Sequence, residues 1–252
     1  MKDYIQEAAL EASGQVTLVP GNRSGSVAAL AIAPADVNAG VGALANGLGH
    51  STYAQFGKRV FDISLTVLTA PIWMLVIGIC SIALMIEGGN PFYRQARLGR
   101  GGRTFQILKL RTMVMDAEAQ FETMMQTDAA LRHEWDTTQK LKNDPRITRV
   151  GNMLRKTSLD ELPQLWNVLI GDMSLVGPRP MLPEQLSLYG PSGPYFSLRP
   201  GITGLWQVSA RNEEVFSFRS RMDAIYARSV SFWQDIVLLF KTVGVVVRRT
   251  GY

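Results

Sequence analysis

Residues 63–86 read ISLTVLTAPIWMLVIGICSIALMI and contain no charged side chain. A helix needs about 20 consecutive apolar residues to cross the hydrocarbon core of a bilayer, and this segment is long enough. We therefore predict that the segment contacts a membrane. The rest of the chain then has to fold beside a segment that is held at the bilayer.

The path of this segment depends on its basic flanks and on one proline. Lys58 and Arg59 precede the segment, and further arginines follow it at Arg94, Arg97, Arg100 and Arg103. Basic flanks favour the cytoplasmic side, so both ends are predicted to lie there. Pro71 costs about 3 kcal/mol in a straight helix, and a bend at this point would return both ends to one face. An ordinary kinked transmembrane helix explains the same residues.

Size, charge and cysteine content limit the class of protein. The 252-residue chain can bury one good-sized core, but residues 1–55 are poor in large side chains and are predicted to form a flexible tail. The net charge of +5 favours anionic partners, which include phosphorylated small molecules, lipid headgroups and nucleic acid. The single cysteine, Cys80, excludes an intramolecular disulfide, and the sequence has no Cys/His cluster of the zinc-binding type. Asp62, at the polar boundary, is expected to snorkel or to pair with Lys58 or Arg59.

The sequence predicts secondary structure for two segments after the apolar run. Glycines separate RQAR from RTFQILKLRTM, which predicts a short hairpin or strand beside the membrane. Lys109 and Arg111 are two residues apart in a strand-like stretch, so we expect them on one face as candidates for a site. Residues 115–142 lack glycine and proline and predict one long amphipathic helix that ends before Asp144-Pro145. His133 would be a surface or packing residue of this helix.

Adjacent carboxylates, Asp160 and Glu161, follow a basic run that comprises Arg146, Arg149, Arg155 and Lys156. Arginine contacts phosphate in a bidentate manner, and a carboxylate among arginines stays ionised and can act as a nucleophile or a magnesium ligand. This arrangement predicts a metal-dependent phosphate site. The alternative is structural, because Ser158 and Glu161 match a capping box and Asp160 is favourable near a helix N-terminus.

Three later features carry weaker signals. Arg179 lies between two prolines that fix its backbone, which suits a residue that holds a phosphoryl group. The stretch RPGITGLWQVSARN suits nucleotide or pyrophosphate contact, and equally a tightly turned structural loop. Residues 230–247 are apolar, but Asp235 and Lys241 disfavour a second span. An interfacial helix or a buried core helix explains this last pattern.

Several long motifs occur in order from Lys58 to Tyr252. They are KRVFD, the proline-broken apolar segment, FYRQARLGRGGRTFQILKLRTM, DPRITRVGNMLRKTSLDELPQLWNVLIGDMSLVGPRP and RPGITGLWQVSARN. In these motifs the chain resembles the bacterial sugar transferases that start exopolysaccharide synthesis, the monotopic polyprenyl-phosphate phosphoglycosyltransferases. The resemblance implies an α/β-like small catalytic domain with a re-entrant, helix-break-helix membrane segment and interfacial amphipathic helices. The expected parts are a flexible tail over residues 1–55, the membrane segment over 56–90 and the catalytic domain over 91–252.

The resemblance also implies the reaction. Family members transfer a hexose 1-phosphate from a UDP-sugar to undecaprenyl phosphate, releasing UMP and forming an undecaprenyl-diphosphate-sugar. This transfer is the first membrane step of exopolysaccharide synthesis. At the family's dyad position, Asp160 would form a covalent phospho-sugar intermediate that the lipid phosphate then attacks in a ping-pong cycle. Glu161, together with Asp160, would bind Mg²⁺.

Other roles follow from matching positions. Lys109, Arg155 and Arg179 would bind phosphate groups, and Arg211 the nucleotide or the sugar. The membrane break would lie at Ala70-Pro71, where many relatives have Ser-Pro. The hydroxyl that would bond a freed carbonyl is then expected to be missing. The expected location is the bacterial inner membrane, with the active site on the cytoplasmic face.

The expected partners are UDP-galactose or UDP-glucose, undecaprenyl phosphate, membrane lipids and downstream glycosyltransferases, with no nucleic acid. One rival hypothesis is a catalytically inactive membrane scaffold of a polysaccharide assembly complex, which would not need the Asp-Glu pair. A second is a nucleic-acid-binding membrane protein, which the basic run from Arg94 to Arg111 permits but no recognised module supports.

Overall fold

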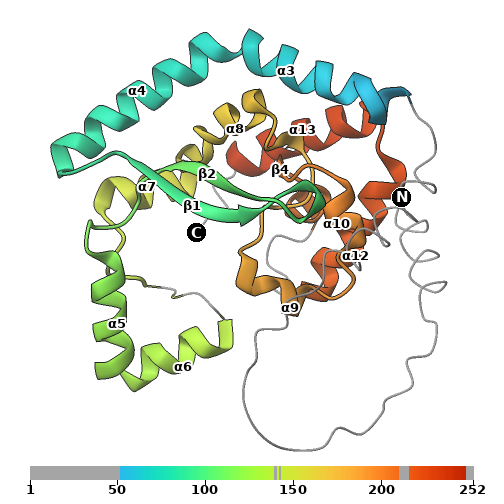
Figure 1. Cartoon of the computed structure of the whole chain (residues 1–252). Helices are drawn as coiled ribbons and strands as arrows, with labels where there is room; N and C mark the ends of the chain where they lie inside the picture. The colour runs from blue at the N-terminus through green and yellow to red at the C-terminus, as the bar shows by residue number, and fades with distance from the viewer. Residues whose placement is uncertain (1–51, 139–140, 142, 210–215, 248–252) are drawn as a thin grey trace, which may run out of the picture. The chain divides into compact units, whose positions relative to one another are not determined.

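The structure is a computed structural model that describes residues 52–138, 141, 143–209 and 216–247 (Figure 1). All of these residues belong to one unit, which spans residues 33–252. Most of the tail expected over residues 1–55 lies outside the described residues. A π-helical turn, η1 (Tyr53–Gly57), already leads into the first long helix.

Two small sheets hold two strands each. β1 (Phe92–Leu98) pairs antiparallel with β2 (Thr104–Leu110), and β3 (Ser174–Val176) pairs parallel with β4 (Gly201–Thr203). The remaining elements described below, in chain order, are η2 (Arg100–Gly102), α7 (Arg149–Thr157), η3 (Leu159–Glu161), α8 (Gln164–Ile170), η4 (Pro183–Gln185), α9 (Leu186–Tyr189), α10 (Gly193–Ser197), α11 (Leu205–Ser209), α12 (Phe216–Ser229) and α13 (Phe232–Val247). The expectation of a fold that mixes helices and strands is therefore confirmed.

The apolar segment forms two helices, α3 (Lys58–Leu68) and α4 (Ala70–Glu87), which meet at a bend at the top of Figure 1. The helices separate at Thr69, one residue before Ala70-Pro71. Pro71 thus lies in the first turn of α4, where its missing N–H would have no helical partner anyway. In the part of the chain that the structure describes, α4 is the one helix long and apolar enough to cross a membrane.

Side-chain donors satisfy carbonyl groups at the bend, so the expectation that a hydroxyl is missing there is wrong. Thr69 Oγ1 donates to the Leu65 carbonyl at 2.8 Å, and Trp73 Nε1 donates to the Thr66 carbonyl at 3.0 Å. A backbone group left unbonded in lipid costs several kcal/mol, so these bonds make the break compatible with a membrane. The hydroxyl was missed because it lies two residues before the proline instead of one.

The outer surface of the two helices is apolar. Its exposed side chains include Val60, Val67, Leu68, Ile72, Leu75, Ile79, Ile82 and Ile86. A contiguous exposed apolar surface of this kind marks a contact with a membrane or another protein.

The predicted hairpin is present, but its two candidate cations separate. Tyr93 pairs with Lys109 across the strands, and β2 ends at Leu110. Because the strand stops there, the alternation of faces does not extend to Arg111. The Arg111 guanidinium instead donates to the carbonyls of Leu84 and Gly88 at the end of α4. The prediction that Arg111 shares a site with Lys109 is therefore wrong.

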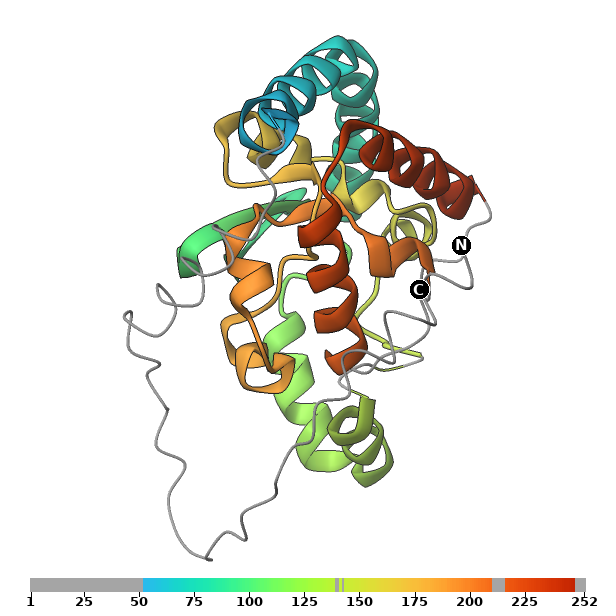
Figure 2. The same ribbon diagram turned by 90° about the vertical axis from the view of Figure 1, so that its right-hand side faces the viewer.

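The long helix predicted over residues 115–142 is two helices, α5 (Ala117–Thr127) and α6 (Ala129–Thr138). Asp128 has extended backbone dihedrals between them, and its carboxylate accepts hydrogen bonds from the N–H groups of Ala130 and Leu131. An aspartate at this position starts a new helix by satisfying its first free N–H groups. Figures 1 and 2 show this pair of helices projecting away from α3 and α4.

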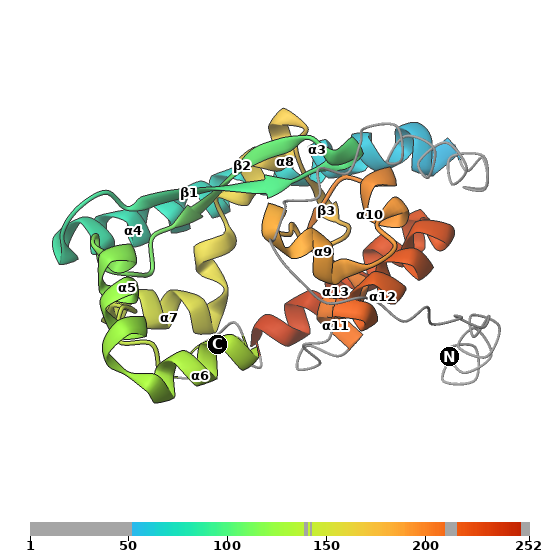
Figure 3. The same cartoon turned by 60° about the horizontal axis from the view of Figure 1, so that its bottom comes forward.

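The main core lies where β2, α8 and β3 meet the C-terminal helices, and β2 lies beside α8 in Figures 1 and 3. Its buried members are Ile107, Val168, Met173, Leu175, Val176, Tyr226, Val230 and Leu238. Burial of these side chains holds the hairpin, α8 and the C-terminal helices as one body.

Two buried carboxylates fasten α3 to this body. Asp235, in the first turn of α13, accepts hydrogen bonds from Tyr53 and Lys58 at 2.7 Å each and from Tyr226 at 2.6 Å. Asp62 accepts from the Ser174 hydroxyl at 2.7 Å and from a backbone N–H at 3.2 Å. The prediction that Asp62 snorkels or pairs with Lys58 or Arg59 is wrong, because Lys58 binds Asp235 instead.

The C-terminal helix α13 has one buried and one exposed apolar face. Leu238 is 2% exposed, whereas Trp233 and Phe240 are 75% and 73% exposed. The expectations of a core helix and of an interfacial helix thus each describe one face. An exposed stripe with a tryptophan is typical of helices that lie in the headgroup region.

Candidate active site

A strained residue sets the position of the two adjacent carboxylates. Helix α7 ends at Ser158, which has φ 56° and ψ 20° and is the one non-glycine residue with positive φ in the described ranges. The 3₁₀ turn η3 follows and carries Asp160 and Glu161. A non-glycine residue in this conformation costs about 1 kcal/mol or more, and such strain concentrates at functional sites. Ser158 makes no capping bond at η3, so the capping-box interpretation is wrong.

Close backbone packing holds the elements on either side of this turn. A Cβ atom on Gly151 of α7 would lie 2.1 Å from the Thr112 carbonyl, so α7 can pack this closely only because glycine has no side chain. The Gly177 N–H donates to Thr203, and the Gly201 N–H donates to Pro178. These bonds fix the segment after β3 and hold Arg179 over η3.

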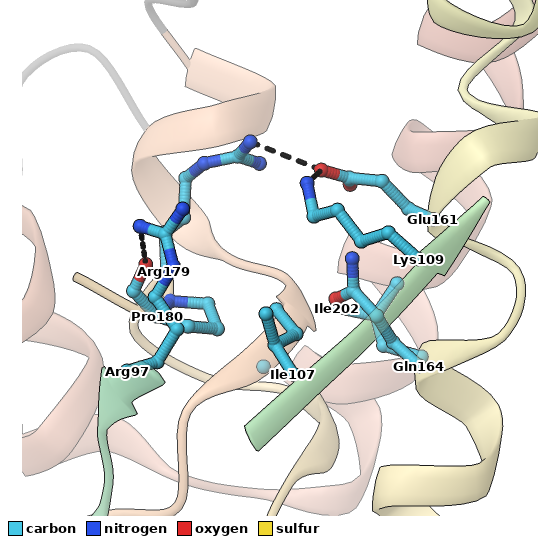
Figure 4. Close-up of a pocket in the computed structure, with 9 residues that line it drawn as sticks. Arg97, Ile107, Lys109, Glu161, Gln164, Arg179, Pro180 and Ile202 are labelled. Carbon is cyan, nitrogen blue, oxygen red and sulfur yellow. Dashed lines mark hydrogen bonds and ion pairs between the residues drawn. The ribbon is translucent and has the colours of Figure 1, made fainter. Parts of the chain in front are cut away.

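Glu161 is clamped between two cations. Its Oε1 atom accepts a hydrogen bond from Lys109 Nζ at 2.8 Å and another from Arg179 Nη2 at 3.0 Å (Figure 4). Burial raises the pKa of this carboxyl, but Arg179 and Lys109 outweigh the burial and hold the pKa of Glu161 well below its usual range. Glu161 is therefore an anion across the physiological range of pH.

Asp160 has the opposite electrostatic environment. Burial, and next the negative charge of Glu161, raise the pKa of Asp160 to about 6. Lys109, Arg155 and Arg179 act against this rise. The carboxylate form of Asp160 still predominates at neutral pH, but it is poorly solvated and not neutralised by an ion pair in the described residues. Two adjacent acids with pKa values pushed apart are typical of an active site with two roles.

Arg155 approaches this pair from α7. Its Nε atom donates to Thr112 Oγ1 at 2.8 Å, and burial lowers the pKa of its guanidinium while Asp160 raises it. The residues of the basic run before it do not all face the carboxylates. The Arg146 guanidinium donates two hydrogen bonds to Asp144, two residues earlier in the chain. Arg155 is thus near the carboxylates, whereas Arg146 is part of a local ion pair.

The polar pocket beside Glu161 contains an arginine that the sequence reasoning assigned to the membrane flank. Arg97 lines the pocket with Lys109, Arg179 and Gln164. It donates to the Pro180 carbonyl at 3.2 Å and to Gln95 Oε1 at 2.5 Å, while its buried Nε atom has no partner among the described residues. Arg97 and Lys109 lie on one face of the hairpin. The register of the hairpin was the signal that could have revealed Arg97.

The pocket is small in this structure, with a volume of about 20 Å³. This is room for about one water molecule. Four cations, Lys109, Arg179, Arg97 and Arg155, surround two acids, so the site has an excess of positive charge. A ligand with several negative charges could take over the bonds that Lys109 and Arg179 now make to Glu161.

The carboxylates are compatible with one mode of metal binding. No group of three or more His, Cys, Asp or Glu side chains suited to a metal occurs in the described parts of the chain. Mg²⁺ is commonly bound through one or two carboxylates together with substrate phosphates and water. Asp160 and Glu161 fit that donor set when a diphosphate is present.

Two groups of expected site residues lie elsewhere. Ala70 and Pro71 are at the bend of the membrane segment, not at the carboxylates. Arg211 falls outside the described residues. Arg199, which precedes β4, donates to the Gly171 carbonyl at 2.9 Å and thereby supports the end of α8.

Comparisons with known proteins identify the family of the chain. The profile of the bacterial sugar transferase family matches residues 53–249. The chain is 49% identical to a UDP-galactose-lipid carrier transferase of Erwinia amylovora over 205 residues, which are 80% of this chain and 42% of that protein. It is 41% identical to the exopolysaccharide production protein ExoY of Sinorhizobium fredii over 199 residues, which are 77% of this chain and 87% of that protein.

A third relative names a different sugar. The chain is 37% identical to a UDP-glucose:undecaprenyl-phosphate glucose-1-phosphate transferase of Caulobacter vibrioides over 196 residues, 74% of this chain and 68% of that protein. The chain belongs to the bacterial sugar transferase family. It spans about two fifths of the length of the Erwinia relative and most of the length of ExoY.

Proposed function

We propose that the chain transfers a hexose 1-phosphate from a UDP-sugar, UDP-galactose or UDP-glucose, to undecaprenyl phosphate and releases UMP. The observation that carries this proposal is the pair of adjacent carboxylates, of which Asp160 has no ion-pair partner among the described residues and Glu161 is held by Lys109 and Arg179. The relatives' names, which include UDP-sugars and undecaprenyl phosphate, support the identity of the two substrates.

In the first step, an Asp160 carboxylate oxygen attacks the sugar-bearing phosphorus of the donor. The bond from that phosphorus to the bridging oxygen breaks, and UMP leaves with the bridging oxygen and its electron pair. The sugar phosphate is then joined to Asp160 as an acyl phosphate. Asp160 can attack because its carboxylate form predominates at neutral pH while no ion pair with a described residue holds it.

In the second step, a phosphate oxygen of undecaprenyl phosphate attacks the same phosphorus. The bond to Asp160 breaks, the carboxylate is regenerated, and the lipid diphosphate sugar leaves. Neither step needs a base to remove a proton from the nucleophile, because both nucleophiles are already anions. The work of the protein is therefore to position the groups and to neutralise negative charge.

The cations that now bind Glu161 would do that work. Lys109 and Arg179 would turn from Glu161 to the donor diphosphate, and Arg97 would offer its unpartnered Nε to the same anion. Glu161 and Asp160 would hold Mg²⁺. The ion, when bound, supplies further neutralisation of the diphosphate charge. Arg155 would bind a phosphate group, and Arg211 would bind the nucleotide or the sugar.

The proposed topology is a re-entrant membrane segment over residues 56–90, with the catalytic domain of residues 91–252 on the cytoplasmic face of the bacterial inner membrane. The bend at Thr69, its satisfied carbonyl groups and the basic residues at both ends support it. Single cysteines at Gln55 and Arg94 in a Cys80→Ala background should both react with impermeant reagents from the cytoplasm only. Reaction of one of them from outside would establish a spanning helix.

The activity is tested by UMP release. Purified protein with Mg²⁺ and undecaprenyl phosphate should release UMP from UDP-galactose or UDP-glucose, and Asp160→Asn should not. The preferred donor would identify the sugar. A folded wild-type protein that releases no UMP from a panel of UDP-sugars would overturn the proposal in favour of the inactive scaffold.

A further inference from the structure

A second cavity lies next to the polar pocket and differs from it in chemistry. Its volume is about 270 Å³, and its walls come from η3, α8, β4, α11 and α13. Apolar side chains supply most of the wall, among them Leu162, Leu165, Val208, Leu239 and Val246. We refer to it as the apolar groove.

The apolar groove begins at the active site. Glu161 and Ile202 line both the groove and the polar pocket. The polar pocket is thus lined by Lys109 and Arg179, whereas the groove is lined mainly by apolar side chains. A ligand that fills both parts has to carry an anionic head and an apolar tail.

The hydroxyl groups in the groove wall are already satisfied. Thr203 and Thr242 bond to each other at 2.6 Å, and Thr242 also donates to the Leu238 carbonyl at 2.7 Å. A sugar or a nucleotide needs several free donors and acceptors in its binding site, whereas these two hydroxyls bond to each other and the wall adds Gln207 Oε1, a buried acceptor without a partner among the described residues. A hydrocarbon chain makes no hydrogen bonds, so it can pack against this wall without leaving any polar group of its own unpaired.

The groove lies under the helix that has the exposed apolar stripe. Val246 lines the groove, whereas Phe240 and Val243 of the same helix α13 are 73% and 61% exposed. A helix with such a stripe suits the boundary between headgroups and acyl chains. An apolar chain that leaves the groove past α13 would thus meet the exposed side chains of Phe240 and Val243.

We propose that the apolar groove receives the first isoprenyl units of the polyprenyl phosphate acceptor and thereby places its phosphate beside Asp160. This inference rests on the proposed function and adds the part of the molecule that recognises the second substrate. The groove shares Glu161 and Ile202 with the polar pocket, so the two spaces adjoin as the tail and the head of a single-chain lipid phosphate would require. Glu161, freed from Lys109 and Arg179, would stand at the junction between tail and phosphate.

Two substitutions on one helix test the groove. Val246→Trp places a large side chain in the groove, and Val243→Trp places the same side chain on the exposed face three residues away. We expect Val246→Trp to raise the KM for undecaprenyl phosphate at least tenfold, while the single burst of UMP in the absence of lipid keeps its amplitude. Val243→Trp should keep the wild-type KM for the lipid. Equal KM values for both variants and the wild type would overturn the inference.

A measurement on the wild-type protein does not depend on the folding of a variant. A polyprenyl phosphate with a photoreactive diazirine in its first isoprenyl unit should label residues of α8, α11 or α13 that line the groove. Labelling confined to α3 and α4 would contradict the inference. Equal labelling of the groove by a phosphatidylglycerol with a diazirine near its headgroup would also contradict it, because the groove would then be a general lipid site.

The two proposals fail in different ways. Absence of UMP release from the wild-type protein would refute the proposed function. Normal UMP release and normal turnover, with groove substitutions that leave the lipid KM unchanged, would refute the groove alone.

Discussion

Two of the clusters of buried carboxylates and cations in the described residues differ in one respect, because only one of them has the properties of an active site. In the α3–α13 cluster, Asp235 accepts bonds from Tyr53, Lys58 and Tyr226, and Asp62 from Ser174 and a backbone N–H. In the η3 cluster, Glu161 accepts two bonds on its Oε1 atom, but Asp160 makes no ion pair among the described residues.

The difference shows that the presence of buried charge does not identify a site. The α3–α13 cluster is saturated, and it joins α3 to α13 and to β3. The η3 cluster combines a left-handed Ser158, an unpartnered nitrogen on Arg97 and a surplus of cations. Saturated networks stabilise a fold, whereas unsaturated networks beside a pocket retain the capacity to bind.

The largest expected effect is a loss of turnover on substitution in the η3 cluster. Asp160→Asn should lower turnover by at least about 10³-fold, because it removes the nucleophile while keeping nearly the same shape. The midpoint of thermal unfolding and the membrane-bound fraction should stay close to those of the wild type. Turnover assays with calorimetry on the same preparation measure both. Normal turnover would show that Asp160 is not the nucleophile.

The second prediction is a loss of stability without a loss of activity. Asp235→Asn should destabilise the fold by about 3–5 kcal/mol, because it leaves Lys58 buried without its counter-ion. Denaturant unfolding gives the free energy, and activity per folded molecule should persist. The double variant Lys58→Met/Asp235→Leu is the matched control, and it should recover part of the loss. A single variant as stable as the wild type would show that this cluster does not fasten α3.

A third prediction concerns the cations of the polar pocket. Lys109→Met and Arg179→Met should each lower kcat/KM for the UDP-sugar by about 10- to 100-fold, since each removes a charge that stabilises the transferring phosphate. Arg97→Met should have a similar or smaller effect. Steady-state kinetics measure these changes. Arg146→Met is the control, because its guanidinium bonds to Asp144 instead, and a loss as large in that variant would contradict the assignment.

The fourth prediction is the smallest and concerns pH. The pKa of Asp160 is raised from 3.8 to about 6, and the attack needs the ionised form, so kcat/KM for the donor should rise with pH and be half-maximal near pH 6. In Lys109→Met the midpoint should move to higher pH, because Lys109 lowers the pKa of Asp160. A midpoint near pH 4 in the wild type would contradict the environment described for Asp160.

The sequence predicted features whose causes are local. The hairpin follows from its glycines, and the bend in the membrane segment follows from Pro71. The Asp160–Glu161 pair stood out beside its basic run, although spacing alone also fitted a capping box. The resemblance to a family decided between these interpretations, and the left-handed Ser158 gives the physical reason why no cap forms.

Features that depend on distant contacts were not predictable. Asp62 and Lys58 are four residues apart in the sequence, yet each bonds to a different partner more than a hundred residues away. Arg97 was read as one of several flanking arginines because only the strand register places it on the same face of the hairpin as Lys109. The division between α5 and α6 did have a local signal, the capping Asp128, which a composition rich in helix formers concealed.

The most direct test is intact-protein mass spectrometry after incubation with the UDP-sugar and Mg²⁺ in the absence of lipid. The wild-type protein should gain the mass of one hexose phosphate, peptide mapping should locate it on Asp160, and addition of undecaprenyl phosphate should remove it. Asp160→Asn should gain nothing. UMP release that occurs only when lipid is present, with no adduct on the protein, would show that the lipid attacks the donor directly and that Asp160 is not a covalent nucleophile.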